Sequence, residues 1–296
     1  MKTRIITGSA YTLLAVAALI FLQSPLLLCI VIVFTVIGAH EICHAAQMKN
    51  KAMIAVSMVA AALVPPALEY WPLIQERLRV PAYPLVLGYF LLLLALMLSQ
   101  FGKTRFTHVL YALFASLVMP GGMATIVLLR NSIRDREGAA FEPNLAAWLL
   151  FFVLCAAWLT DVFALVAGMN FGKHKLAPKI SPKKTVEGAI GGLVGMTVVN
   201  VGFALAFNQF FLEKFKINLL AVVLLSLAAG TVSMVGDLAM SVLKRNYGFK
   251  DFGKFFPGHG GVMDRFDSVL MVSPFVYALV MVEQSLNLRL LYEVLA

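Results

Sequence analysis

The densest run of polar residues in the chain lies between residues 236 and 267. Within it, Asp237, Ser241 and Lys244 are spaced so that they share one face of a helix. Asp264 and Asp267 would share a helical face in the same way. Asp237 follows a long apolar stretch, where a carboxylate is costly unless it is paired or bound to a metal. These carboxylates are therefore candidate catalytic groups.

The chemistry best suited to this run is nucleotidyl transfer. A glycine-rich turn, Pro257-Gly-His-Gly-Gly261, lies between the carboxylates, and glycine lets backbone N–H groups approach a ligand closely. Mg²⁺ binds one or two carboxylates and takes phosphate oxygens and water as its other ligands. Neighbouring lysines and arginines would neutralise charge on the phosphoryl oxygens. The alternative, a solvated loop with ordinary surface ion pairs, fits less well with so many acidic, basic and glycine-rich elements in one segment.

A second polar segment, residues 169–187, contains five lysines. Lysines beside an apolar segment often do no more than anchor it at a membrane surface. Ser181 followed by Pro182, however, is typical of a helix N-cap with proline at the first helical position. The sequence therefore predicts a helix capped by Ser181, whose free N–H groups form an anion site beside Lys183 and Lys184.

The composition indicates that a membrane protein positions these groups. Of the 296 residues, 61% are hydrophobic and 13% are charged, unlike the proportions of soluble domains. The net charge is +9, but the basic residues lie between apolar blocks, which favours anionic ligands and membrane anchoring over a nucleic-acid partner. Cys29, Cys43 and Cys155 all lie in apolar segments and are interpreted as buried hydrophobic residues.

Nine stretches meet or approach the length of about 20 apolar residues that a membrane-spanning helix needs. We therefore predict an all-α polytopic bundle of about nine transmembrane helices. Pro65 and Pro66 are expected to end the third helix early. The first stretch is interpreted as a retained span, because no signal-peptide cleavage pattern follows it. The stretches are Ile5–Leu22, Pro25–Ala46, Ala52–Leu68, Tyr83–Leu98, Phe106–Leu129, Leu145–Gly168, Gly188–Phe211, Ile217–Leu238 and Phe266–Val282.

The distribution of basic residues predicts a cytoplasmic N-terminus and an outside C-terminus. With this orientation, sixteen of the 24 lysines and arginines fall in cytoplasmic segments. The two polar loops, 169–187 and 244–267, then both face the cytoplasm, where nucleotides are available. We interpret residues 1–135 as a transmembrane scaffold and residues 136–296 as the catalytic region that carries both loops.

The segment from Ser241 to Asp267 resembles, position for position, the signature of the phosphatidate cytidylyltransferases, or CDP-diacylglycerol synthases. The loop that runs through Ser181 and Glu187 is also similar to this family, so the resemblance covers about residues 160–268. The sequence departs from the family pattern after Asp161, where Leu165 and Met169 replace a tyrosine and a basic residue, and this leaves the lipid acceptor open. The matching residues are Ser241, Lys244, Arg245, Lys250, Asp251, Gly253, Pro257, His259, Gly260, Gly261, Asp264, Arg265 and Asp267.

The resemblance implies Mg²⁺-dependent, in-line transfer of a cytidylyl group from CTP to phosphatidate, by an enzyme of the bacterial inner membrane whose active site faces the cytoplasm. Asp237 and Asp264 would bind the metal, and Lys244 and Asp267 would complete the catalytic set. A second cation and a homodimer are left open, and the lipid bilayer is the expected surrounding. The residues expected to bind the substrates are Ser241, Arg245, Lys250, Asp251, His259, Gly260, Gly261, Arg265, Lys173, Ser181, Lys183, Lys184, Thr185, Glu187 and Asp161.

A competing motif, His40-Glu41-Ile-Cys-His44, lies near the end of the second predicted span. Two imidazoles four residues apart on a helix, with a neighbouring glutamate, could bind Zn²⁺ as in an intramembrane metalloprotease. The alternative interpretation is that these groups end an ordinary span and that a neighbouring group satisfies Glu41. Two further alternatives are a CTP-dependent polyprenol or phytol kinase and an anion transporter, although the inverted repeats of a transporter are not visible.

Overall fold

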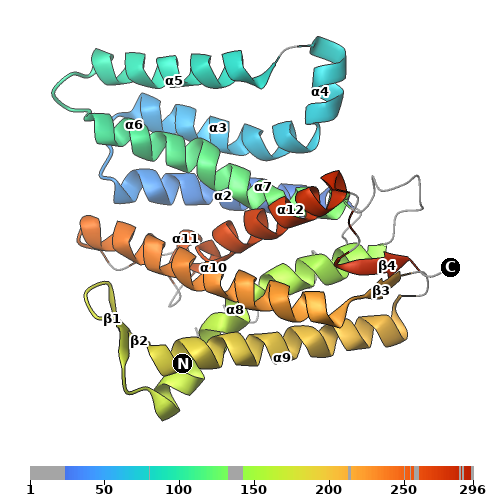
Figure 1. Cartoon of the computed structure of the whole chain (residues 1–296). Coiled ribbons are helices and arrows are strands. Elements are labelled where there is room, and N and C mark those ends of the chain that lie inside the picture. The colour runs from blue at the N-terminus through green and yellow to red at the C-terminus, as the bar shows by residue number, and fades with distance from the viewer. Residues whose placement is uncertain are drawn as a thin grey trace. The chain divides into compact units, whose positions relative to one another are not determined.

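The chain is built mainly from long apolar helices, shown in the computed structural model of Figure 1. The structure describes residues 24–79, 81–132, 143–212, 215–249, 251–253, 255–256, 260–286, 288 and 290–294. The first predicted span, Ile5–Leu22, lies outside these residues. The chain divides into two compact units: unit 1 comprises Met1–Val127 and Tyr247–Phe266, and unit 2 comprises Leu128–Asn246 and Asp267–Ala296.

Among the residues that the structure describes, seven helices are long and apolar enough to cross a membrane, which confirms a polytopic all-α membrane protein. They correspond to the second to eighth predicted spans, with ends that agree within a few residues except at the end of α10. The ninth predicted span is a shorter apolar helix, α12 (Val269–Ser285). The seven helices are Leu26–Ala45, Lys51–Glu69, Ala82–Ser99, Phe106–Ser132, Pro143–Phe171, Val186–Phe210 and Leu219–Asn246.

In unit 1, helices α2, α3 and the π-helical segment η1 pack together. Asn50 caps α3, because its side-chain oxygen accepts a hydrogen bond from the Met53 N–H at 3.1 Å. Helix α5 buries only Leu93, and its remaining apolar surface suits contact with lipid. The elements of unit 1 are α2 (Leu26–Ala45), α3 (Lys51–Glu69), α4 (Trp71–Leu78), α5 (Ala82–Ser99), α6 (Phe106–Leu113), η1 (Phe114–Val118) and α11 (Met263–Phe266), and α7 (Met119–Ser132) continues into unit 2.

Helix α3 continues through Pro65 and Pro66 to Glu69, so the prediction that these prolines end it early is wrong. Proline at position 65 removes the N–H that would have bonded to the Ala61 carbonyl one turn earlier. The Thr35 hydroxyl of α2 lies 3.0 Å from that carbonyl in a buried position, and 2.9 Å from the Ile32 carbonyl of its own helix, so its single proton is shared between the two acceptors. A neighbouring helix therefore offers a donor to the carbonyl that the proline leaves without its usual partner.

In unit 2, α8 packs against α9, α10 and α12, and the fully buried Trp148 and Phe152 of α8 lie in the core. Figure 1 shows α8 and α9 side by side. Their close approach depends on glycine: a Cβ at Gly192 would lie 2.7 Å from the Thr160 carbonyl oxygen. The elements of unit 2 are α8 (Pro143–Phe171), β1 (Lys175–Ala177), β2 (Ser181–Thr185), α9 (Val186–Phe210), β3 (Phe215–Ile217), α10 (Leu219–Asn246), α12 and β4 (Tyr292–Val294).

The loop between α8 and α9 contains an antiparallel hairpin, in which β1 pairs with β2. The prediction that Ser181 caps the next helix is therefore wrong, because Ser181 begins β2 and α9 begins at Val186. Thr185 is the actual cap, and its hydroxyl accepts a hydrogen bond from the Gly188 N–H at 3.1 Å. Pro182 is compatible with β2 because both strands of an isolated hairpin are edge strands, which tolerate a residue without an N–H donor.

Candidate active site

Three aspartates of unit 2, Asp161 on α8, Asp237 on α10 and Asp267 just before α12, form an acidic cluster around one lysine. The ammonium group of Lys184, on β2, forms an ion pair with Asp237 and lies 3.7 Å from Asp161 Oδ1. Asp267 is buried and interacts electrostatically with both other aspartates and with Lys184. The fold thus joins residues that are far apart in the sequence into one charged site.

The electrostatics of this acidic cluster show how strongly its members act on one another. Burial alone would lower the pKa of Lys184, but the Asp237 and Asp161 carboxylates outweigh it and hold the pKa of the lysine above its usual value. Burial, followed by the charge of Asp237, raises the pKa of Asp267 to about 7, although the positive charge of Lys244 acts in the opposite direction. A positive charge placed beside these carboxylates is therefore strongly stabilised.

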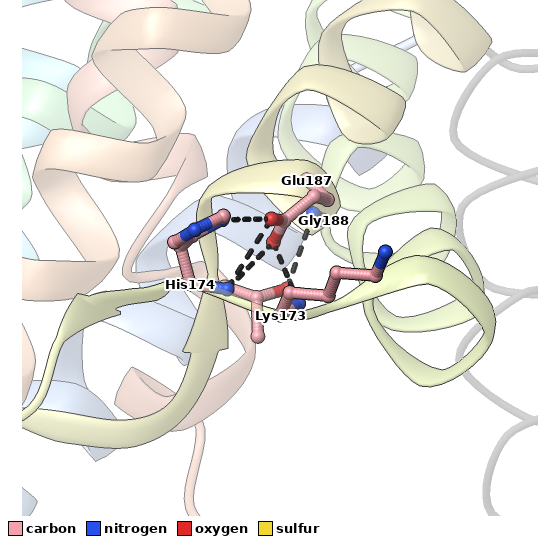
Figure 2. Close-up of polar contacts among 5 residues, drawn as sticks. Lys173, His174, Glu187 and Gly188 are labelled. Atoms are coloured by element: carbon pink, nitrogen blue, oxygen red, sulfur yellow. Dashed lines mark hydrogen bonds and ion pairs between the residues drawn. The ribbon is translucent and has the colours of Figure 1, made fainter.

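The hairpin that carries Lys184 is fastened at its base by Glu187, as Figure 2 shows. The Glu187 carboxylate accepts hydrogen bonds from the backbone N–H groups of Lys173 and His174, at 3.0 and 3.1 Å. The His174 ring lies 2.6 Å from the same carboxylate, through Nδ1. At the end of β2, the buried Thr185 packs against Gly168 of α8, where an added Cβ would lie 2.9 Å from the Thr185 hydroxyl oxygen. These contacts determine where β2 places its lysine.

In unit 1, Asp264 on α11 contacts the backbone at Gly260 and Gly261, the described end of the glycine-rich segment. Its Oδ2 accepts hydrogen bonds from the backbone N–H groups of Phe252, at 2.7 Å, and Gly261, at 2.9 Å. Gly260 adopts a φ of +88°, and a Cβ there would lie 2.9 Å from the same oxygen. The glycines thus allow the backbone to fold around the Asp264 carboxylate, and this wrapping fixes the direction of that carboxylate.

In the sequence, Glu41 belongs to the His40–His44 motif that could bind zinc, but in unit 1 its carboxylate contacts the backbone of a distant segment. Its carboxylate accepts hydrogen bonds from the backbone N–H groups of Val262 and Met263, each at 3.0 Å. The rings of His40 and His44 are stacked, with centroids 6.3 Å apart. Among the residues that the structure describes, no three His, Cys, Asp or Glu side chains form a metal-binding group. The interpretation that a neighbouring group satisfies Glu41 is confirmed.

The comparisons with known proteins agree with this chemistry. The model of the cytidylyltransferase family matches residues 2–282 of the chain. The chain belongs to the cytidylyltransferase family. A phosphatidate cytidylyltransferase of Bacillus subtilis (strain 168) is 34% identical over 226 residues, which cover 69% of this chain and 81% of that protein. One from Rickettsia bellii (strain RML369-C) is 30% identical over 184 residues, which cover 61% and 74%, respectively.

Membership of the cytidylyltransferase family makes this chain a nucleotidyltransferase, as the signature in residues 241–267 predicted. A shorter but closer match is the phosphatidate cytidylyltransferase of Staphylococcus haemolyticus (strain JCSC1435), 40% identical over 125 residues, which cover 42% of this chain and 46% of that protein.

The acidic cluster of this cytidylyltransferase fits the needs of Mg²⁺. Its side chains offer only carboxylate oxygens, which this ion prefers, and Mg²⁺ requires no more than one or two of them from the protein. The ion pair of Asp237 with Lys184 shows that this carboxylate already attracts a cationic group. Asp237 belongs to unit 2 and Asp264 to unit 1, so their joint role in binding one metal stays a prediction.

The other predicted site residues of the cytidylyltransferase lie in several places. Ser241, Lys244 and Arg245 are on α10 and Arg265 is on α11, while Lys173, Lys183 and Asp251 are exposed. Glu187 accepts hydrogen bonds from the backbone of the hairpin, and Thr185 caps α9. The substrate-binding roles predicted for the residues of this paragraph stay predictions. Lys250 and His259 lie outside the described residues.

Proposed function

We propose that this chain is a phosphatidate cytidylyltransferase, which converts CTP and phosphatidate into CDP-diacylglycerol and pyrophosphate. The observation that carries the proposal is the meeting of Lys184 with Asp161 and Asp237, within a chain that belongs to the cytidylyltransferase family. Carboxylates suited to a divalent cation lie directly beside a cationic group suited to phosphate. The names of the bacterial relatives support phosphatidate as the acceptor.

The reaction is an in-line displacement at phosphorus. A phosphate oxygen of phosphatidate forms a new bond to the α-phosphorus of CTP. The bond from that phosphorus to the bridging oxygen breaks, and pyrophosphate leaves with the electron pair. Phosphate monoesters are largely deprotonated near neutral pH, so no strong general base is required. Positioning and charge neutralisation would therefore supply most of the rate enhancement.

The residues of the chain would divide this work between them. Asp237 and Asp264 would hold Mg²⁺, with Asp267 supporting them, and a second cation is left open. When bound, Mg²⁺ would neutralise negative charge on the phosphoryl oxygens. Lys244 and Arg265 would bind phosphate groups. Lys184 would contribute its charge from the hairpin, beside the same carboxylates.

The setting of the reaction follows from the apolar helices. We place the protein in the bacterial inner membrane, with the N-terminus and the loops 169–187 and 244–267 on the cytoplasmic side, because the basic residues concentrate there. Phosphatidate would then reach the site from the inner leaflet, and CTP from the cytoplasm. A homodimer remains compatible with this arrangement.

The test uses purified protein in detergent with phosphatidate, Mg²⁺ and CTP labelled at the α-phosphate. We expect the label to appear in lipid with the wild-type protein, and to be absent with Asp264→Asn. A folded wild-type preparation that yields no labelled lipid would contradict the proposal. Label transferred from γ-labelled CTP to a lipid would instead identify a kinase.

A further inference from the structure

Glu41 is a buried acidic residue of unit 1, and it contacts a segment far away in the sequence. It lies in the last turns of α2 and is only 6% exposed. Its partners, Val262 and Met263, are 221 and 222 residues further along the chain. Burying a carboxylate is costly unless charge-assisted hydrogen bonds compensate for it, and Glu41 receives two. Two directional hydrogen bonds therefore hold Glu41 against the backbone of Val262 and Met263.

The backbone of residues 261–263 presents three consecutive N–H groups to two carboxylates. The Gly261 N–H donates to Asp264, and the next two N–H groups donate to Glu41. A Cβ at Gly261 or at Gly253 would collide with the Glu41 carboxylate, so glycine at both positions lets the segment close around it. Glu41 and Asp264 thus hold one short stretch of backbone between them.

Helix α2 supports this segment along a whole face. Phe34, Gly38 and Glu41 are spaced so that they lie on the same side of the helix. The Phe34 ring packs 4.9 Å from the ring of Phe266, measured between centroids. At Gly38, an added Cβ would lie 3.2 Å from the sulfur of Met263, so this side chain packs directly on α2. Glu41 supplies the polar part of this contact, and its two hydrogen bonds fix which residues of the segment lie against α2.

We propose that Glu41 is a positioning residue for cytidylyl transfer: by holding the backbone of residues 261–263, it fixes the direction in which Asp264 presents its carboxylate to the metal. This inference rests on the metal-binding role proposed above for Asp264. Glu41 acts through the backbone and does not itself touch a substrate. Residues that orient a metal ligand in this way influence metal affinity by roughly 10- to 100-fold.

The experiment compares full-length wild-type protein with Glu41→Gln in detergent. Each carboxylate oxygen of Glu41 accepts one backbone N–H bond. Glutamine has only one acceptor oxygen, so one of these two bonds is lost, and its NH₂ group faces a backbone N–H that also donates. Binding of Mn²⁺, followed by electron paramagnetic resonance in the absence of CTP, should weaken by about 10-fold or more. The Mg²⁺ concentration for half-maximal activity should rise in parallel, while the KM for phosphatidate stays within about 2-fold, since no lipid contact changes.

Glu283 provides the matched control. It is also buried and accepts two backbone N–H bonds, from Leu290 and Leu291 at 2.8 and 3.1 Å, but within unit 2 at the end of α12. Glu283→Ala should lower thermal stability and leave Mn²⁺ binding unchanged. A folded Glu41→Gln protein with wild-type Mn²⁺ affinity would overturn the proposal.

Two further variants make every outcome decisive. If Glu41→Gln does not fold, Glu41→Asp takes its place. If neither variant folds while Glu283→Ala does, Glu41 has a role in the fold alone, and the proposal is overturned. Asp264→Asn should also lose Mn²⁺ affinity. If Asp264→Asn binds Mn²⁺ like the wild type, Asp264 does not bind the metal, and the inference about Glu41 fails with that role. If Asp264→Asn loses affinity while Glu41→Gln keeps it, only the inference about Glu41 fails.

Discussion

At the scale of single residues, Lys184 connects the hairpin to the acidic cluster. Its side chain is 24% exposed and that of Asp237 is 19% exposed, so their ion pair is partly shielded from water. Partly buried pairs of this kind are screened less by salt than surface pairs. The ammonium group can balance the carboxylates and also attract the phosphate groups of CTP. The Lys184 side chain therefore both attaches the hairpin to the acidic cluster and adds a positive charge to that cluster.

Replacing Lys184 by methionine should lower kcat/KM for CTP by about 100-fold, because a preorganised cationic donor is lost while the length of the side chain is kept. Steady-state assays with labelled CTP measure the effect. Lys179→Met is the control, since Lys179 lies exposed between the two strands of the same hairpin. Equal losses of activity in both variants would contradict a specific role for Lys184 and indicate a general effect of charge.

At the scale of elements, α3 shows how a helix tolerates two prolines in its interior. At Pro65, the carbonyl that loses its helical donor is that of Ala61, and the Thr35 hydroxyl of α2 lies 3.0 Å from it. Thr35→Val should therefore destabilise the protein by about 1–3 kcal/mol, the usual effect of leaving a buried acceptor unsatisfied. Thermal unfolding in detergent measures this change. Thr231→Val, at an exposed position on α10 whose hydroxyl bonds within its own helix, should change stability by less than about 0.5 kcal/mol.

The pairing of α8 with α9 is a second property of elements that a substitution can test. Gly192→Ala would push a methyl group against the Thr160 carbonyl and the Ala164 side chain, and should destabilise the protein by about 1–3 kcal/mol. Gly202 lies on the same helix, and no atom of the described residues beyond the helix's own nearby backbone lies within 4 Å of a Cβ placed there. Gly202→Ala should be neutral or slightly stabilising, because alanine is the better helix former. A smaller loss of thermal stability for Gly192→Ala than for Gly202→Ala would contradict this account.

At the scale of the whole molecule, the predicted orientation places the hairpin in the cytoplasm and α4 outside. This can be tested in a variant whose three native cysteines are replaced by alanine and which carries one new cysteine. In intact cells, a membrane-impermeant maleimide should label Arg77→Cys on α4 and should not label Lys179→Cys on the hairpin. Permeabilised cells should allow labelling of both. The reverse pattern in intact cells would show the opposite topology.

Much of this molecule follows from the sequence alone. The bilayer requires about 20 apolar residues for each span, so the second to eighth spans were predictable from local composition. The same holds for the signature in residues 241–267, which identified the chemistry because its residue types and spacing occur within one continuous segment. Local caps were less predictable: Ser181 and Thr185 are both good capping residues, and only the pairing of β1 with β2 selects Thr185.

The tertiary structure alone decided which distant groups meet. Nothing in the local sequence links Lys184 to Asp161, or Glu41 to Val262, because such pairs depend on how separate helices pack. The same holds for α3, where the hydroxyl that approaches the Ala61 carbonyl near Pro65 comes from Thr35 on another helix. Composition and spacing determined the membrane helices and the class of chemistry; the long-range hydrogen bonds and ion pairs determined which residues position that chemistry, since a buried polar group takes its partner wherever the fold brings one within reach.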